Sequence, residues 1–104
     1  MIRVVYRWTV TPGQEDTFVT AWREVTAILR AQVEGARGSL LLRDPEAPQE
    51  FTAVARWTSR AALLAFRAGP PVDQALARHA AVMRATAVRQ SEAVLDELDD
   101  LTVD

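Results

Sequence analysis

The sequence predicts one small domain of the α+β class, and three observations lead to this prediction. Apolar and polar residues alternate along residues 2–10 and 50–57, which is the period of a β-strand. Apolar residues at helical spacing follow each of these stretches. Turn residues at 44–48 join the second stretch to a short apolar run before it. The resulting order of strand, helix, strand, strand, helix, strand is the split βαβ arrangement of ferredoxin-like folds, with a four-stranded antiparallel sheet.

The first strand is expected over residues 2–10. Five apolar or aromatic residues alternate there with other residues: Ile2, Val4, Tyr6, Trp8 and Val10. Because successive side chains of a strand point to opposite faces, these five should share the face that packs on helices.

The first helix is expected to begin at an N-cap Thr11, with Gln14 completing a capping box. Apolar residues then recur at helical spacing at Phe18, Trp22, Val25 and Leu29. The helix should run to about Val33 and end near Gly35 and Gly38, since glycine readily adopts the positive φ of a helix C-cap.

A hairpin is expected next, with strands at 39–43 and 50–57 around the turn at 44–48. One face of its second strand carries Phe51, Ala53, Ala55 and Trp57. Thr58 or Ser59 should cap a short helix that ends at Gly69.

Another helix is expected to open at residues 70–71. Its inner face would carry Val72, Leu76, His79 or Ala80, and Met83. Residues 92–96 fit a last strand or a continued helix, and the topology favours the strand. The acidic tail from Asp99 should be frayed, with Asp99 and Asp100 solvated.

The second face of the sheet is expected to be partly apolar and strongly basic. The residues assigned to it are Arg3, Val5, Arg7, Leu41, Arg43, Val54 and Arg56. Glu92, Asp96 and the acidic tail are the charge complements, within the chain or across a two-fold axis. A half-apolar face left in water predicts a homodimer.

Composition excludes several classes of function. The 104 residues should form a single domain, 1–104, and their formal net charge of -2 disfavours nucleic acid or an anionic membrane as partner. With no cysteine and one histidine, disulfides and thiolate sites are excluded and a metal site is disfavoured. No phosphate-binding glycine loop, signal peptide or membrane-length apolar segment is present, so we expect no cofactor and a cytoplasmic protein.

Three segments, in this order along residues 2–68, resemble the antibiotic biosynthesis monooxygenase family. Residues 12–22 resemble its strand-to-helix junction, Pro-Gly-x-Glu-x-x-Phe-x-x-x-Trp. Residues 38–42, Gly-Ser-Leu-Leu-Leu, resemble the entry to its second strand. Residues 51–66 resemble its strand that ends in Trp57 and is followed by a Ser and a helix with a Phe.

The resemblance implies a dimeric α/β barrel, a homodimer of ferredoxin-like protomers with a pocket between sheet and helices. It further implies a cofactor-independent monooxygenase acting on an aromatic polyketide, an anthrone or a quinol. Anthrone-oxidising relatives carry an Asn and a Tyr at positions that look like Ala53 and Leu63. The haem-degrading branch uses an Asn on the first strand, which residues 2–10 lack, and a helix His that could correspond to His79.

Two residues are the catalytic candidates, His79 and Trp57. His79 is the only imidazole and is suited to proton transfer near neutral pH, although a place at the polar edge of its helix would explain it equally. The substrate-binding candidates, which could instead be core residues, are Tyr6, Trp8, Trp22, Phe66 and Met83. A cofactor-free polyketide cyclase or isomerase, or a non-catalytic ligand-binding accessory dimer, would need the same aromatic pocket.

Overall fold

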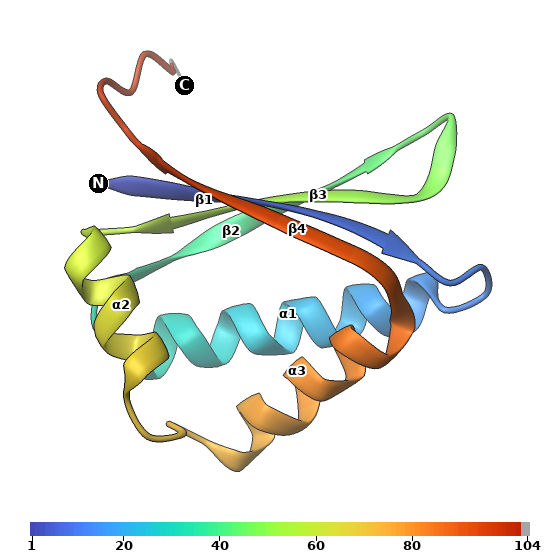
Figure 1. Cartoon of the computed structure of the whole chain (residues 1–104), viewed down its shortest axis with the longest axis horizontal. Helices are drawn as coiled ribbons and strands as arrows, with labels where there is room; N and C mark the ends of the chain where they lie inside the picture. The colour runs from blue at the N-terminus through green and yellow to red at the C-terminus, as the bar shows by residue number, and fades with distance from the viewer. Residues whose placement is uncertain (103–104) are drawn as a thin grey trace.

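Four antiparallel strands form one sheet, and three helices lie together on one side of it (Figure 1). The structure, a computed structural model, describes residues 1–102. The strand order is β2 (Ala36–Asp44), β3 (Ala47–Trp57), β1 (Ile2–Val10), β4 (Ala87–Asp96), which places β1 in the interior of the sheet. The predicted ferredoxin-like α+β fold is confirmed.

The central strand has the bounds and the faces that the sequence predicts. β1 spans Ile2–Val10 and pairs with β3 on one side and β4 on the other. Ile2, Val4, Trp8 and Val10 are buried, and Tyr6 is half-buried on the same face. This face therefore supplies the sheet's share of the core.

The first helix begins later than the sequence predicts. α1 spans Glu15–Gln32, and its N-cap is Gln14, which makes no side-chain capping bond. The capping box at Thr11 is wrong: the Thr11 carbonyl instead accepts a hydrogen bond from the Gln14 amide at 3.0 Å. This closes a turn through Gly13, whose φ is 90°. The helix ends at a C-cap Val33, as predicted.

The hairpin is longer than predicted, with a shorter turn. β2 spans Ala36–Asp44 and β3 spans Ala47–Trp57. Pro48, which was assigned to the turn, lies inside β3. The pairing of the two strands is irregular between Ala36 and Ser39, around Gly38 with its φ of 89°.

This irregularity reverses the faces of β2. Leu41 lies opposite Ala53, a fully buried residue of the helix-facing side, and Arg43 lies opposite buried Phe51. The assignment of Leu41 and Arg43 to the second face is therefore wrong, because one residue of slip moves every side chain to the other side. Leu40 and Leu42, exposed at 60% and 50%, point to that face instead.

The two remaining helices are short. α2 spans Arg60–Ala68 and is capped by Ser59, as predicted; the Ser59 hydroxyl accepts from the Ala62 amide at 3.0 Å. α3 spans Gln74–Thr86 and begins at an Asp73 cap rather than at residues 70–71. The side chain of Val72, predicted on its inner face, lies outside the helix and is exposed.

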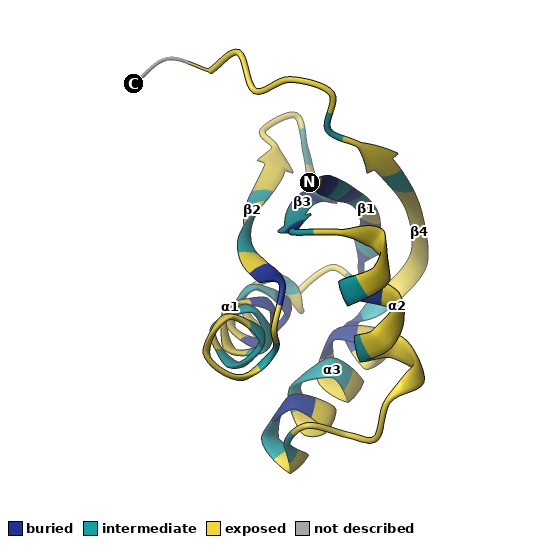
Figure 2. Cartoon of the chain, turned by 90° about the vertical axis from the view of Figure 1, so that its left-hand side faces the viewer, coloured by how far each residue is buried: buried dark blue, intermediate teal, exposed yellow. Residues whose placement is uncertain are grey.

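The last strand is confirmed against the helical alternative. β4 spans Ala87–Asp96 and pairs with β1 along its length. Residues 97–102 cross the uncovered face of the sheet (Figure 2). Of the predicted tail, residues 103–104 lie outside the described residues.

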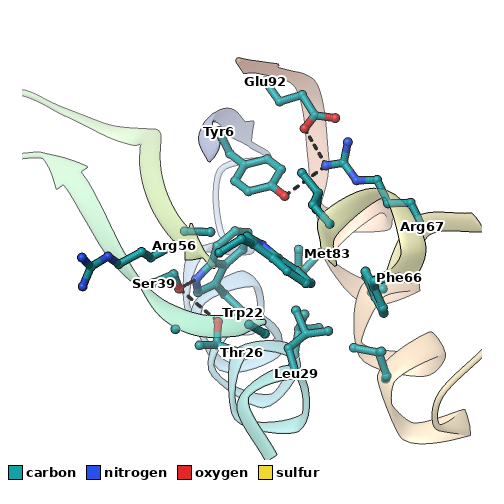
Figure 3. A pocket seen from close by; sticks show the side chains of 18 of the residues that line it. Tyr6, Trp22, Thr26, Leu29, Ser39, Arg56, Phe66, Arg67, Met83 and Glu92 are labelled. Atoms are coloured by element: carbon teal, nitrogen blue, oxygen red, sulfur yellow. Dashed lines mark hydrogen bonds and ion pairs between the residues drawn. The ribbon is translucent and has the colours of Figure 1, made fainter. Parts of the chain in front are cut away.

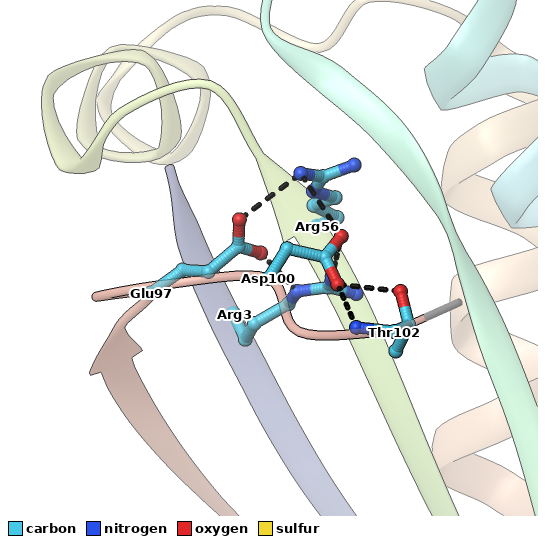
Figure 4. A network of polar contacts seen from close by, with 5 residues as sticks. All are labelled: Arg3, Arg56, Glu97, Asp100 and Thr102. Carbon is cyan, nitrogen blue, oxygen red and sulfur yellow. Dashed lines mark hydrogen bonds and ion pairs between the residues drawn. The ribbon is translucent and has the colours of Figure 1, made fainter.

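Ion pairs within the chain hold this tail against the sheet (Figure 4). Glu97 accepts from Arg3 Nε at 2.6 Å and from Arg56 Nη2 at 3.0 Å. Asp100 Oδ2 lies 4.0 Å from Arg3 Nη2 and 3.9 Å from Arg56 Nη2. Asp99 and Asp100 are exposed, as predicted, although the Asp100 carboxylate lies beside the two arginines. The expected acidic complement is partly supplied inside one chain, since Arg3 and Arg56 are cross-strand neighbours.

The core consists of two hydrophobic clusters. One gathers buried residues around α1 and α3: Trp8, Val10, Phe18, Ala21, Trp22, Phe51, Ala53 and Met83. The other gathers buried residues around α2: Ile2, Val4, Ala36, Trp57 and Leu63. Tyr6 packs against both clusters, so it lies at their junction. None of the helices within residues 1–102 has the length and apolar character needed to cross a bilayer.

Replacing Gly35 should destabilise the fold more than replacing Gly13, although both have a φ near 90°. A Cβ on Gly35 would lie 2.6 Å from Ala62 Cβ and 2.8 Å from Thr58 Oγ1, whereas one on Gly13 meets nothing within 4 Å. We expect Gly13→Ala to cost about 1–2 kcal/mol from backbone strain and Gly35→Ala about 1–3 kcal/mol more from the clash. Urea unfolding at one protein concentration measures both, and equal costs would contradict the close contact.

Candidate functional site

A cavity of about 450 Å³ opens between the sheet and the helices, where the two clusters of the core meet. All six aromatic or Met candidates other than His79 line it: Tyr6, Trp8, Trp22, Trp57, Phe66 and Met83. They come from β1, α1, β3, α2 and α3. The fold thus brings together residues that are spread over most of the chain.

Aromatic rings form a large part of the wall of this cavity. Tyr6 meets Trp22 edge to face, with ring centroids 5.5 Å apart, and Trp57 lies 5.6 Å from Phe66. Trp8 packs on Trp22 at 6.3 Å. Such rings offer apolar faces and edges for a flat ligand.

One wall carries a small hydrogen-bonded group (Figure 3). The Trp22 indole Nε1 donates to Ser39 Oγ at 3.0 Å, and Thr26 Oγ1 lies 3.1 Å from the same oxygen. Ser39 faces the cavity because it lies opposite Ala55 on the helix-facing side of the sheet. These contacts fix the orientation of the Trp22 ring.

A second polar group lies at the rim of the cavity, where three elements meet (Figure 3). Arg67, in the last turn of α2, donates from Nη2 to Glu92 Oε2 at 2.7 Å and to the Tyr6 hydroxyl at 3.4 Å. Glu92 lies opposite Tyr6 in the pairing of β4 with β1, so both side chains project toward the helices. Arg67 and Glu92 are partly exposed, with side chains 38% and 35% accessible.

Burial governs the acidity of the Tyr6 phenol. Loss of solvent raises its pKa above the ordinary 10.0, and the nearby charge of Glu92 raises it further, while Arg67 lowers it through its charge and hydrogen bond. Since burial is the largest of these effects, the phenol keeps its proton at neutral pH. Tyr6 can therefore accept from Arg67 and at the same time donate its proton to a ligand.

The structure does not bring His79 to this cavity. It lies half-buried in a separate shallow depression with Thr17, Thr20, Ala21 and Val82, between α1 and α3. The inner face of α3 carries Leu76, Ala80 and Met83 instead, so of the two expected residues the helix turns Ala80 toward the cavity. Within residues 1–102, no group of three or more acidic or His side chains is placed to hold a metal ion.

Sequence reasoning missed Arg67, Glu92, Ser39 and Thr26. Arg67 and Glu92 are 25 positions apart, and only the register of β4 brings them together. Ser39 carried a signal: it belongs to the Gly-Ser segment that enters β2, but its facing depended on the irregularity at Gly38. A correct register for β2 would have found it.

Comparison with known proteins gives a family and several similar folds. The family described as antibiotic biosynthesis monooxygenase matches residues 1–78. SnoaB, a cofactor-independent oxygenase from Streptomyces nogalater, is 23% identical, with 96% of this chain and 95% of that chain covered and a TM-score of 0.79. A protein from Mycobacterium tuberculosis is 22% identical over 97% and 98% of the two chains, with a TM-score of 0.74. A search among curated proteins gives no match.

The acidity of Tyr6 can be measured directly, because it is the only tyrosine. Ultraviolet titration of tyrosinate should give a midpoint above 10.0, since burial disfavours the anion. Arg67→Ala should move the midpoint higher, because the cation that stabilises the phenolate is lost. Arg60→Ala, at the exposed start of the same helix, is the control and should leave it unchanged. A wild-type midpoint at or below 10.0 would contradict the burial of the phenol.

Proposed function

The chain belongs to the antibiotic biosynthesis monooxygenase family, and we propose that it is a cofactor-independent monooxygenase that oxidises a flat aromatic substrate. An aromatic polyketide, an anthrone or a quinol fits this description. The observation that carries the proposal is a cavity of about 450 Å³ with aromatic walls and a polar rim. Sites for small molecules are mostly apolar, with a few polar groups that fix orientation. The similarity to an oxygenase named as cofactor-independent adds support.

The proposed reaction needs no electron donor besides the substrate. In an anthrone, one oxygen atom of O₂ replaces the two hydrogens of the ring methylene, and the other leaves as water. The substrate thereby supplies all four electrons. Loss of a proton from the methylene gives an electron-rich enolate that reduces oxygen, so the protein must favour this anion and exclude bulk water.

Tyr6 is the residue we assign to the substrate oxygen. Its phenol stays protonated and donates, whereas the positions at which the resemblance implies Asn and Tyr hold the apolar, buried Ala53 and Leu63. A hydroxyl group on β1 would then take the place of the polar side chains that those relatives carry on β3 and α2. Trp22, Trp57 and Phe66 would hold the rings, and the indole N–H of Trp57 can donate a hydrogen bond but does not transfer its proton near neutral pH.

The predicted role of His79 as base stays a prediction. Its place between α1 and α3, outside the cavity, favours a structural role. Among the described residues that line the cavity, Glu92 supplies the one carboxylate, so Glu92 or water is the acceptor that we assign to a substrate proton.

We also propose that the chain forms a homodimer through the uncovered face of the sheet. This face exposes Leu40, Leu42 and Leu95 around the half-buried Val5 and Val54. Within residues 1–102, no helix or strand covers this surface. A second copy would bury it, and the family resemblance implies the same pairing.

Anthrone should be converted to anthraquinone with one O₂ consumed per product and with no added cofactor. Tyr6→Phe should lower the rate about tenfold or more, because a donor to the developing anion is lost. His79→Ala should keep the rate within about twofold, whereas removal of a general base costs about 10²-fold or more. An oxygen electrode and product absorbance measure both.

Each outcome of this experiment separates two readings. A loss of about 10²-fold in His79→Ala, in a protein that still folds, would restore the imidazole as base and overturn its structural assignment. If a product forms at the same rate without O₂, and contains no more oxygen atoms than the substrate, the alternative function of a cyclase or isomerase is favoured.

Leu42→Glu should convert the dimer to a monomer, because a buried carboxylate without a partner is strongly unfavourable in an apolar interface. Leu64→Glu is the matched control: Leu64 is 55% exposed and lies on α2, on the helix side. Light scattering should give twice the chain mass for the wild type and the control. A monomeric wild type at micromolar concentration would remove the proposed interface.

A further inference from the structure

The guanidinium at the rim of the cavity is only partly used by its neighbours. Arg67 makes both of its hydrogen bonds, to Glu92 and to Tyr6, through Nη2. Within residues 1–102, no hydrogen bond engages its Nε or Nη1. Three N–H donors of a fixed cation therefore remain available beside the cavity.

We propose that Arg67, together with the Tyr6 hydroxyl, binds the ionised oxygen of a phenolic or enolic substrate. This rests on the proposed function, because it assumes that the cavity takes a flat aromatic molecule. The guanidinium and the phenol touch at 3.4 Å, so one oxygen at the rim can accept from both. The phenol supplies a neutral donor and the guanidinium supplies the charge.

Glu92 acts as a positioning residue in this arrangement. Its carboxylate holds Arg67 at 2.7 Å, and its place opposite Tyr6 on β4 sets the guanidinium next to the phenol. Without this contact, a long arginine side chain with 38% of its surface accessible would sample many rotamers. The ion pair thus confines the cation to the rim.

The charges around the rim favour an anion. Arg67 on α2 and Arg84 on α3 both line the cavity, and Glu92 on β4 is the carboxylate that faces them. Arg56 also lines the cavity, but its charge is paired with Glu97. One negative charge among the two remaining positive ones leaves the rim positive. An anion inside the cavity is also screened less than in water, because the aromatic walls exclude solvent.

The test uses two probes that differ by one oxygen, 2-hydroxyanthraquinone and anthraquinone. Both are already oxidised, so binding is measured without turnover by quenching of tryptophan fluorescence. The phenol and phenolate of the first probe absorb at different visible wavelengths, so its ionisation can be followed while it is bound. Binding to the wild type should lower the pKa of its phenol by about one unit or more, since a nearby cation stabilises the phenolate.

Arg67→Ala should abolish this lowering and weaken binding of the phenolate about tenfold, while anthraquinone binds as before. Arg67→Lys should recover part of the lowering, because it keeps the charge without the guanidinium fork. Glu92→Gln should weaken phenolate binding less than Arg67→Ala, since the cation is retained but no longer held, and the loss of a negative charge beside the bound anion offsets part of this effect. Arg60→Ala, at the far end of α2, is the matched control and should match the wild type.

The outcomes separate this inference from the proposed function. If both probes bind and Arg67→Ala leaves the phenol pKa of the bound probe unchanged, Arg67 is not the anion site, although the aromatic cavity stands. If neither probe binds to the wild type, both proposals fail. If Arg67→Ala does not fold, Arg67→Gln decides in its place, because it keeps a long polar side chain without the charge. A pKa lowering in Arg67→Gln equal to that of the wild type would overturn the inference.

Discussion

The split of the core into two clusters determines where everything else lies. β1 takes part in both: Trp8 and Val10 belong to the cluster under α1 and α3, and Ile2 and Val4 to the cluster beside α2. Each of these fully buried side chains contributes about 1.5–3 kcal/mol to the free energy of folding. α3 and α2 therefore pack at opposite ends of one strand, while α1 packs against both clusters. Tyr6, between the ends, packs against both clusters and lines the cavity that their separation leaves.

The elements that the sequence predicts well are those in which one physical signal dominates. Residues 2–10 have an apolar or aromatic side chain at every second position, and β1 has these bounds. The errors occur where backbone geometry overrides the pattern. Gly38 interrupts the pairing of β2 with β3, and the resulting slip moves Leu41 to the helix side of the sheet. A regular alternation of side-chain faces between the two strands does not predict this slip. At Thr11 a turn through Gly13 competes with the cap and delays the helix.

In the candidate site, too, some residues are predicted well from the sequence and others are not, and the difference follows the distinction between apolar and polar residues. The aromatic candidates line the cavity, because their spacing in strands and helices already placed them on inner faces. The position of His79 could not be predicted from spacing alone, because the neighbouring Ala80 fits the inner face of α3 equally well. Only the packing of α3 against α1 decides which of the two faces the cavity. Arg67 and Glu92 meet through tertiary contact and carry no local signal. Sequence periodicity thus predicts the walls of a cavity better than the polar groups at its rim.

The ion pair at the rim contributes little to folding, and this bears on its role. Arg67 and Glu92 are both more than one third accessible, and such pairs contribute about 0–1 kcal/mol to stability. Burying the pair would cost several kcal/mol per ion before any contact with a ligand. A rim position avoids that cost while keeping the guanidinium next to the Tyr6 phenol. When a flat ligand enters and displaces water, the same charges interact more strongly, so an arrangement nearly neutral for folding becomes significant for binding.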